Sequence, residues 1–252
     1  MKIGAQFYTL RDKCQDLEGL SASLKKIKEI GYNYVQISGV CKYDAKWLKD
    51  ELDKIGLTCV LTHFSADEIL NNTEEVVKFH NIFGCKNIGL GSMPYKVNEE
   101  NLYKFIEEFK PVARKIKELG STLCYHNHHW EFSKCADGKY IMDKLAEAFE
   151  PDELHFTLDT YWVQFGGCDV CDVIDKLSGR LTCVHLKDFL LVGEEQRMAS
   201  VGSGSLSFPK IIKHLEAAGT EYALVEQDNC YGKCPFECLK NSYEYLRGII
   251  ND

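Results

Sequence analysis

Short apolar runs recur along the chain about every 25 to 40 residues. Runs of this length, bounded by turn residues, are typical of buried β-strands. Between them, apolar residues recur with helical spacing, for example over residues 20–30, 102–119 and 208–218. The pattern therefore predicts eight strands that alternate with helices. These strands begin near Ile3, Tyr34, Thr58, Asn87, Thr122, His155, Leu181 and Tyr222.

Glycines mark the ends of several predicted helices. Helices commonly end in a left-handed backbone conformation, which glycine adopts without a steric cost. A last helix is expected from about Pro235 to Ile250, because proline fits the first turn of a helix. The glycines in question are Gly31, Gly56, Gly84, Gly120 and Gly219.

Eight β-α units without an intervening linker predict an α/β fold. We expect a (β/α)8 or TIM barrel that forms a single domain over residues 1–252. A doubly wound open sheet is the alternative, but it should carry a glycine-rich phosphate loop after its first strand. Residues 8–13 (YTLRDK) follow the first strand here, so the barrel is favoured.

Composition and charge narrow the class of protein. Of the 252 residues 45% are hydrophobic, and no apolar stretch reaches the length of about 18 residues needed for a membrane span. The net charge of −8 lacks the basic footprint that nucleic-acid binding requires. The N-terminal residues enter a strand without the layout of a signal peptide, so we expect a cytoplasmic protein.

The twelve cysteines indicate a reducing compartment rather than disulfides, because the chain is large and has no export signal. Cys59, Cys124 and Cys183 lie in apolar runs and are expected to be small buried hydrophobic residues. The other cysteine clusters, in residues 168–171 and 230–238, do not have the spacing of a structural zinc site.

The carboxyl ends of the strands carry the candidate chemistry, because the active site of a (β/α)8 barrel lies there. The ends of strands five to eight offer His126 with His128, then Asp159, His185 and Glu226. Imidazole and carboxylate ligands together suit a borderline divalent cation such as manganese, cobalt or zinc better than magnesium. We therefore expect one divalent metal ion at this end of the barrel.

Each of these residues also has a structural explanation. Asp159 could cap the segment that follows it, and His185 could be a hydrogen-bonded histidine of the barrel. Glu226 follows an apolar run and would be an unpaired buried charge unless it meets a cation. The combination of these residues at successive strand ends indicates a metal site more specifically than any one of them does alone.

The densest group of such side chains is the segment 125–132 (YHNHHWEF), with three histidines and a glutamate. If Tyr125 faces the barrel wall, strand alternation directs His126 and His128 to one side and Asn127 and His129 to the other. The segment is thus expected to supply the fifth-strand part of a site.

Other candidate residues are assigned no role. His155 opens the sixth strand and should lie at the opposite end of the barrel, while His80 and His214 are expected on helix surfaces. The segment 202–205 (GSGS) could cradle a phosphate at a helix N-terminus, although such residues more often form only a turn and a cap.

The strand-end residues resemble those of the xylose isomerase-like TIM barrel superfamily over essentially the whole chain. This superfamily includes sugar epimerases, hydroxypyruvate isomerase, inosose dehydratases and endonuclease IV. The chain looks most like the branch of sugar phosphate isomerases/epimerases, whereas Trp162 and the acidic net charge disfavour the endonuclease. The similarity lies in Gln6, Gly166, Gly167 and the segments 8–11 (YTLR), 125–128 (YHNH), 159–163 (DTYWV), 184–188 (VHLKD), 201–204 (VGSG) and 225–228 (VEQD).

The resemblance also assigns metal ligands, with one departure. In the epimerases of this superfamily, a metal is held by Glu, Asp, His and Glu on strands five to eight. Asp159, His185 and Glu226 match the last three. His126 stands where those enzymes carry the first glutamate, and we predict that it binds the metal instead. One of the two carboxylates that exchange a proton with the substrate is therefore missing.

The resemblance implies a metal-dependent sugar isomerase or epimerase of carbohydrate metabolism. It would act on a keto sugar, a sugar phosphate or a cyclitol through an enediolate, with a small-molecule carbohydrate as its partner. The predicted catalytic residues are Glu226, His128, Glu131 and Lys187. The predicted substrate-binding residues are Gln6, His63, Trp162 and Lys187.

Three alternatives stay open. The inosose dehydratases also have histidines at this strand end, so a lyase acting on a keto-inositol or a 3-keto-glycoside by β-elimination is one. A non-catalytic sugar-binding barrel and a barrel that binds a partner protein are the others. Assembly into a homo-oligomer is not decided by the sequence.

Overall fold

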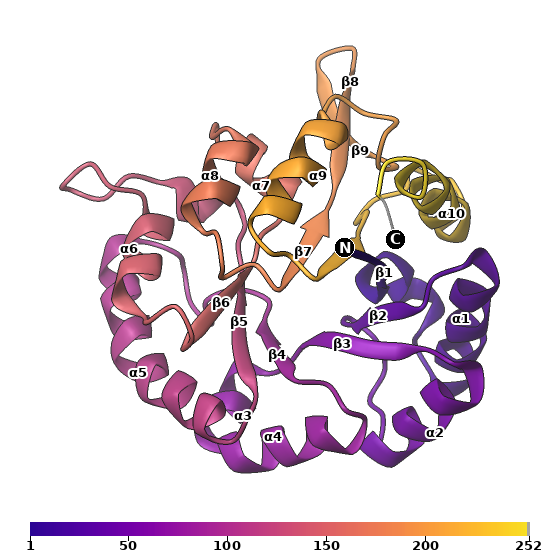
Figure 1. Ribbon diagram of the computed structural model, residues 1–252, viewed down its shortest axis with the longest axis horizontal. Helices are drawn as coiled ribbons and strands as arrows, with labels where there is room; N and C mark the ends of the chain where they lie inside the picture. Colours follow the sequence, from indigo (N-terminus) through magenta and orange to yellow (C-terminus); the bar gives the residue numbers. More distant parts are fainter. Residues whose placement is uncertain (251–252) are drawn as a thin grey trace.

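Eight parallel strands form one sheet that curls into a barrel around the centre of the molecule (Figure 1). The structure is a computed structural model that describes residues 1–250. The predicted TIM barrel is confirmed, and each of its eight strands lies where the apolar runs place it. The strands are β1 (Lys2–Gln6), β2 (Tyr34–Ile37), β3 (Thr58–His63), β4 (Asn87–Leu90), β5 (Thr122–His126), β6 (Leu154–Thr157), β7 (Cys183–Leu186) and β10 (Tyr222–Val225).

The barrel closes between β6 and β7. Neighbouring strands follow the order β6-β5-β4-β3-β2-β1-β10-β7, so these two strands form the ends of the sheet. The backbone N–H of His185 donates to the Leu158 carbonyl at 2.8 Å, and a parallel bridge joins Asp159 to His185. Two of the predicted metal ligands therefore lie at the closure itself.

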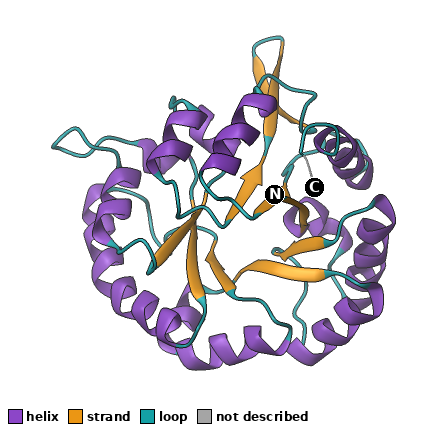
Figure 2. Cartoon of the chain, in the orientation of Figure 1, coloured by secondary structure: helices purple, strands orange, loops and turns teal. Residues whose placement is uncertain are grey.

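Helices cover the outside of the barrel (Figure 2). The predicted helices are present, although the last one ends at Leu246 rather than near Ile250. The five glycines predicted at helix ends all have positive φ, between 74° and 122°. The helices are α1 (Leu17–Ile30), α2 (Ala45–Ile55), α3 (Ala66–Asn71), α4 (Thr73–Ile82), α5 (Glu99–Glu118), α6 (Ile141–Ala148), α7 (Thr160–Phe165), α8 (Val170–Lys176), α9 (Phe208–Ala217) and α10 (Pro235–Leu246), with short 3-10 turns η1 (Phe7–Lys13) and η2 (His129–Phe132).

Strand alternation separates the core from the site. On β5, Tyr125 faces outward, with its ring 5.5 Å from that of Phe105 on α5, so Cys124 and His126 face the barrel interior. Cys124 packs inside the barrel with Cys183 and other apolar residues. The prediction that these cysteines are buried hydrophobic residues is confirmed, and all twelve cysteines are free thiols.

Two features differ from the expectations. An antiparallel hairpin of β8 (Asp188–Val192) and β9 (Glu195–Ala199) was not predicted, and it projects from the barrel (Figure 1). The prediction that His80 lies on a helix surface was wrong. His80 is fully buried, because it lies on the face of α4 that packs against β3, and its Nε2 is 2.8 Å from Thr62 Oγ1. His214 is half-buried next to Asp175.

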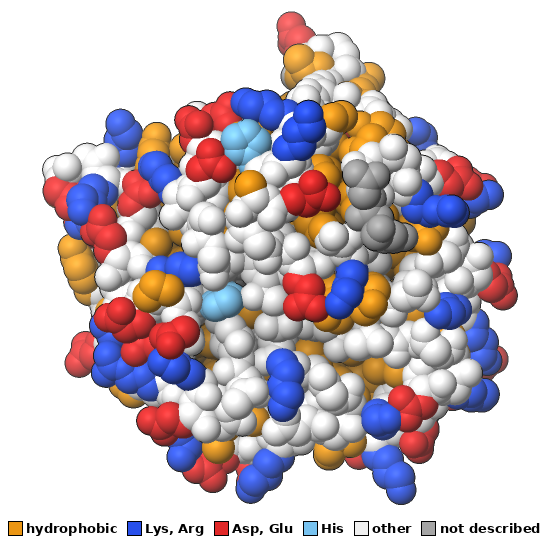
Figure 3. Space-filling view, in the orientation of Figure 1, with side chains coloured by type: hydrophobic (Ala, Val, Ile, Leu, Met, Phe, Trp, Pro, Cys, Tyr) orange, Lys and Arg blue, Asp and Glu red, His pale blue; other side chains and the backbone are white. Residues whose placement is uncertain are grey.

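The surface carries charges of both signs. On the face in Figure 3, acidic and basic side chains are interspersed around the rim. Within residues 1–250, no helix combines the length and the apolar character needed to cross a membrane.

Candidate active site

The four predicted metal ligands meet at one end of the barrel. His126 ends β5, Asp159 follows β6, His185 lies in β7 and Glu226 directly follows β10. One possible ligand atom from each lies within 4.8 Å of those of the other three, and all four residues are buried. These residues therefore form a single group that could hold one metal ion.

Both histidines are oriented by hydrogen bonds on the ring nitrogen that points away from the group. His126 Nδ1 is 2.9 Å from the Gly91 carbonyl oxygen, which can only accept, so this nitrogen carries the proton. His185 Nε2 is 2.6 Å from Gln36 Oε1. The remaining nitrogens, His126 Nε2 and His185 Nδ1, face the carboxylates, as in histidine ligands whose second nitrogen fixes the ring.

Asp159 combines a structural contact with a ligand position. Its Oδ1 accepts from the backbone N–H groups of Tyr161 at 3.0 Å and Trp162 at 3.1 Å, which caps α7. Its Oδ2 points into the group, 3.4 Å from His126 Nε2 and 3.7 Å from His185 Nδ1. The predicted capping contact is thus present, and it leaves one oxygen free for a metal.

Lys187 connects the carboxylates of the group. Its Nζ lies 3.0 Å from Asp159 Oδ2, 2.9 Å from Glu226 Oε2 and 3.0 Å from Asp228 Oδ1. Burial opposes ionisation of Glu226, but Lys187 outweighs it and holds the pKa of the carboxyl well below its usual value. Burial and the charge of Glu226 raise the pKa of Asp228 to about 6. Burial also opposes ionisation of Asp159, but Lys187 outweighs it and lowers the pKa of Asp159 well below its usual value, so both predicted carboxylate ligands are ionised at neutral pH.

The charges and contacts of the group fit a divalent cation. Once His185 has lost its proton, three carboxylates and one ammonium leave two negative charges in a buried place. His185 Nδ1 and Glu226 Oε2 lie 3.0 Å apart, yet neither makes a well-formed hydrogen bond within residues 1–250. Burial opposes protonation of His185, but the nearby carboxylates raise its pKa to about 9, so a metal would displace a proton there.

A polar cavity of about 430 Å³ opens above this group. Its size is in the range of sites for small organic ligands. It is lined by Tyr8, Ser38, His63, Gly91, His126, His128, Trp130, Trp162, Lys187, Glu226 and Asp228.

His63 forms one side of the cavity. Its Nδ1 is 3.2 Å from Ser38 Oγ, and its buried Nε2 has no hydrogen-bond partner among residues 1–250. Burial and the neighbouring His126 ring lower the pKa of His63 well below its usual value, so the imidazole is neutral. Gly91 makes room for it, because a Cβ there would lie 3.3 Å from His63 Nδ1.

His128 and Trp162 form the opposite side. Their ring centroids are 5.4 Å apart, and the Trp162 ring also lies 5.5 Å from Lys187 Nζ. His128 Nδ1 and Trp162 Nε1 are buried without a hydrogen-bond partner in the described residues. Burial lowers the pKa of His128 to about 3, so this ring is neutral as well.

Two predicted site residues are not brought to the cavity wall. Glu131 is fully buried behind β5, where it accepts hydrogen bonds from the Tyr125 hydroxyl at 2.6 Å and the His128 backbone N–H at 2.8 Å. Burial raises the pKa of Glu131 to about 7. Gln6 is also fully buried, and its Oε1 accepts from the Tyr8 backbone N–H at 3.1 Å. Both contacts orient the chain around the cavity.

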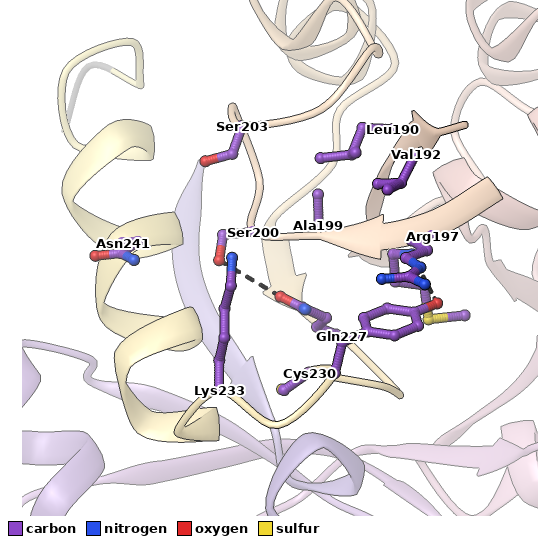
Figure 4. A pocket seen from close by; sticks show the side chains of 12 residues that line it. Leu190, Val192, Arg197, Ala199, Ser200, Ser203, Gln227, Cys230, Lys233 and Asn241 are labelled. Atoms are coloured by element: carbon purple, nitrogen blue, oxygen red, sulfur yellow. Dashed lines mark hydrogen bonds between the residues drawn. The ribbon is translucent and has the colours of Figure 1, made fainter. Parts of the chain in front are cut away.

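The segment 202–205 forms a turn around an internal carboxylate. The backbone N–H groups of Gly202 and Gly204 donate to Asp188 Oδ2 at 3.0 and 2.9 Å. These amides are therefore not available to a phosphate. Ser203 instead lines a separate cavity of about 290 Å³ beside the β8–β9 hairpin (Figure 4).

Several residues that hold the site side chains in position were not assigned a role from the sequence. Gln36 orients His185, Asp228 shares Lys187, and Ser38 orients His63. Gln36 and Asp228 are visible in the sequence as polar residues at strand ends. Their partners are distant in sequence, however, and only the fold pairs them.

The comparisons with known proteins identify the family of this barrel. A sequence model described as xylose isomerase-like TIM barrel matches residues 24–233. The chain belongs to this family. The resemblance inferred from the strand-end residues is thereby confirmed.

Individual relatives are distant. An inosose dehydratase of Geobacillus kaustophilus is 24% identical over 90% of this chain and 86% of its own length. A sugar phosphate isomerase/epimerase of Parabacteroides distasonis superposes with a TM-score of 0.82 at 24% identity, covering 98% of this chain and 93% of that one. An L-ribulose 3-epimerase superposes with a TM-score of 0.75 at 15% identity, covering 98% and 94%. The structural matches show the fold, and together with the curated relatives they indicate a sugar-modifying enzyme.

Proposed function

We propose that the protein is a metal-dependent enzyme that transfers a proton next to the carbonyl group of a keto sugar or cyclitol. It would act as a sugar isomerase or epimerase through an enediolate. The observation that carries this proposal is the convergence of His126, Asp159, His185 and Glu226 at the floor of a polar cavity. A divalent cation held by these residues would supply Lewis acidity toward the substrate carbonyl.

The protein side chains around the cavity have separate tasks in this proposal. Lys187 keeps Asp159 and Glu226 ionised and fixed in position. His63 Nε2 has no partner among residues 1–250 and would hydrogen-bond a substrate oxygen. Trp162 offers a ring face against which the apolar face of a sugar can pack.

His128 is the best-placed group for proton transfer. Its ring lines the cavity, is neutral and has an unpartnered Nδ1. Glu131 is turned away, and Glu226 is engaged with Lys187 and His185. A positioned imidazole that accepts the proton and returns it to the substrate would complete an isomerisation or epimerisation.

The substrate class favoured by the geometry is an unphosphorylated carbohydrate. The glycine-rich segment 202–205 uses its amides on Asp188, and Lys187 is enclosed by three carboxylates. Neither is free to bind a phosphate group.

Dehydration of a cyclitol or keto sugar is the second candidate. Histidine at position 126 leaves one carboxylate fewer for the two-sided proton exchange of an epimerase. Relatives named inosose dehydratase, such as that of Geobacillus kaustophilus, favour this reaction as well. In β-elimination, His128 would remove the same proton and give it to the departing hydroxyl group, which would leave as water.

Incubation with keto sugars and inososes in D₂O containing Mn²⁺ tests the proposal. We expect deuterium to enter at the carbon next to the ketone, and product identity then separates isomer, epimer and dehydrated product. Asp159→Asn and Glu226→Gln should reduce exchange by at least about 100-fold. Asp175→Asn on the exposed side of α8 is the matched control and should exchange at the wild-type rate.

One result would contradict the proposed enzyme activity. If no ketose or inosose exchanges, and the protein binds sugars without a stoichiometric divalent metal, it is a sugar-binding barrel and the enzyme proposal fails.

A further inference from the structure

A second, larger cavity adjoins the polar one. It has a volume of about 530 Å³ and shares Ser38 and His63 with the polar cavity. Residues of the loop after β2, the loop after β3 and helix α4 line it, and the residues of β2 and β3 in its wall lie at the carboxyl ends of those strands. The His63 side chain therefore lies in the wall of both cavities.

The lining of the second cavity is mainly apolar and aromatic, although Lys42, Ser65 and Glu68 also belong to it. Val40 and Tyr43 come from the loop after β2, Phe64 follows β3, and Phe79 belongs to α4. The Phe79 ring lies 5.9 Å from that of Tyr43 and 5.4 Å from that of Phe64. All four side chains are only half-buried. Aromatic rings from three separate segments thus converge on a hollow that the other residues within 1–250 leave open.

The two cavities also meet at Gly39. Gly39 lines the apolar cavity, while Tyr8, which packs directly on it, lines the polar one. A Cβ at position 39 would lie 2.6 Å from Tyr8 Cδ2, and the positive φ of 68° also favours glycine. The contact between Tyr8 and the loop after β2 therefore requires glycine at position 39.

We propose that the apolar cavity binds an aromatic substituent carried by the sugar whose ketone lies in the polar cavity. The substrate class would then be a keto sugar linked to an aryl group. This inference rests on the proposed function, and it assigns the second cavity to the same ligand. A monosaccharide needs no more than the polar cavity, whereas sites for larger organic ligands are mostly apolar with a few convergent polar groups.

Paired ligands test the assignment without requiring chemistry. Calorimetry would compare phenyl β-glucoside with methyl β-glucoside, which share the sugar and have no ketone to react. We expect the phenyl compound to bind about 30-fold more tightly, because its ring leaves water for an apolar surface. The 3-keto derivatives of both compounds would then be assayed for deuterium exchange in D₂O with Mn²⁺.

Two variants on different elements should remove the preference for the phenyl compound in different ways. Val40→Trp fills the cavity, and Phe79→Leu removes a ring from its wall. Each should bring the ratio of phenyl to methyl affinities close to one. Ile82→Trp is the matched control, since Ile82 lies exposed on the same helix as Phe79 and outside the cavity, and it should keep the ratio.

The outcomes separate the two proposals. Exchange with both 3-keto compounds at equal affinity would overturn the aryl site and leave the proposed reaction standing. A phenyl preference that the variants abolish, without exchange by either compound, would support the aryl site and overturn the reaction. A phenyl preference that survives both Val40→Trp and Phe79→Leu would place the ring elsewhere and overturn the assignment.

Discussion

At the scale of single residues, the site depends on groups that contact the candidate metal ligands from behind. Gln36 and the Gly91 carbonyl determine which nitrogens of His185 and His126 face the carboxylates. Such outer contacts keep a ligand ring in one orientation and tautomer. The neutral histidines His63 and His128, by contrast, line the cavity, and each has a buried ring nitrogen without a partner among residues 1–250.

Gln36→Leu should weaken metal binding without removing a ligand. Loss of the 2.6 Å contact frees the His185 ring to rotate or to change tautomer. We expect divalent metal affinity to fall by about 10- to 100-fold. Titration with Mn²⁺ measures it. Gln6→Leu on the neighbouring strand is the control, because the Gln6 amide contacts the Tyr8 backbone instead of a ligand. Equal losses in both variants would contradict the role of Gln36.

At the scale of elements, polar contacts join helices to the strands that they cover. His80 on α4 is the clearest case, with Nδ1 2.7 Å from the Val76 carbonyl and Nε2 2.8 Å from Thr62 Oγ1 on β3. Burial lowers the pKa of His80 from 6.5 to about 4. The folded protein therefore keeps this ring neutral at a pH where the unfolded chain protonates it.

Acid should weaken the fold through His80. Its neutral form stabilises the fold fully above pH 6.5, and this contribution is lost as the pH falls toward about 4, by as much as about 3 kcal/mol. Urea unfolding at several pH values measures the loss. In His80→Phe the decline over this range should be shallower by that amount. His214→Phe, at the half-buried pair with Asp175, should retain the wild-type slope. An unchanged slope in His80→Phe would contradict this account.

At the scale of the whole molecule, the candidate metal group lies where the barrel closes. β6 and β7 form the two ends of the sheet and are joined near Asp159 and His185. A metal held there would link four strands, with His126 and Glu226 contributed by β5 and the end of β10. Metal binding and the stability of the fold are therefore expected to be coupled.

Manganese should raise the melting temperature of the whole chain. At a free concentration of about 100 times the dissociation constant, binding adds about 2.7 kcal/mol, or roughly 5 °C or more for a protein of this size. Thermal unfolding with Mn²⁺ and after treatment with a chelator measures the difference. Asp159→Asn should abolish the shift. An equal shift in that variant would place the metal at another site.

The sequence by itself determined the barrel and the composition of the site. Eight apolar runs with helices between them specify a (β/α)8 barrel, because burial and helical periodicity are local properties of the chain. The rule that strand ends face one site then selects His126, Asp159, His185 and Glu226, and strand alternation directs His126 inward and Tyr125 outward.

Only the tertiary structure decided how these side chains are used. Gln36 and His185 are 149 positions apart, so no local pattern connects them. Glu131 contacts the Tyr125 hydroxyl because η2 redirects the chain directly after β5. Asp188 accepts a hydrogen bond from the Gly202 amide, which the sequence alone made a candidate for binding a phosphate. Hydrogen bonds of buried polar groups are satisfied by whichever partners the fold brings near, and those partners are set by packing across the whole barrel.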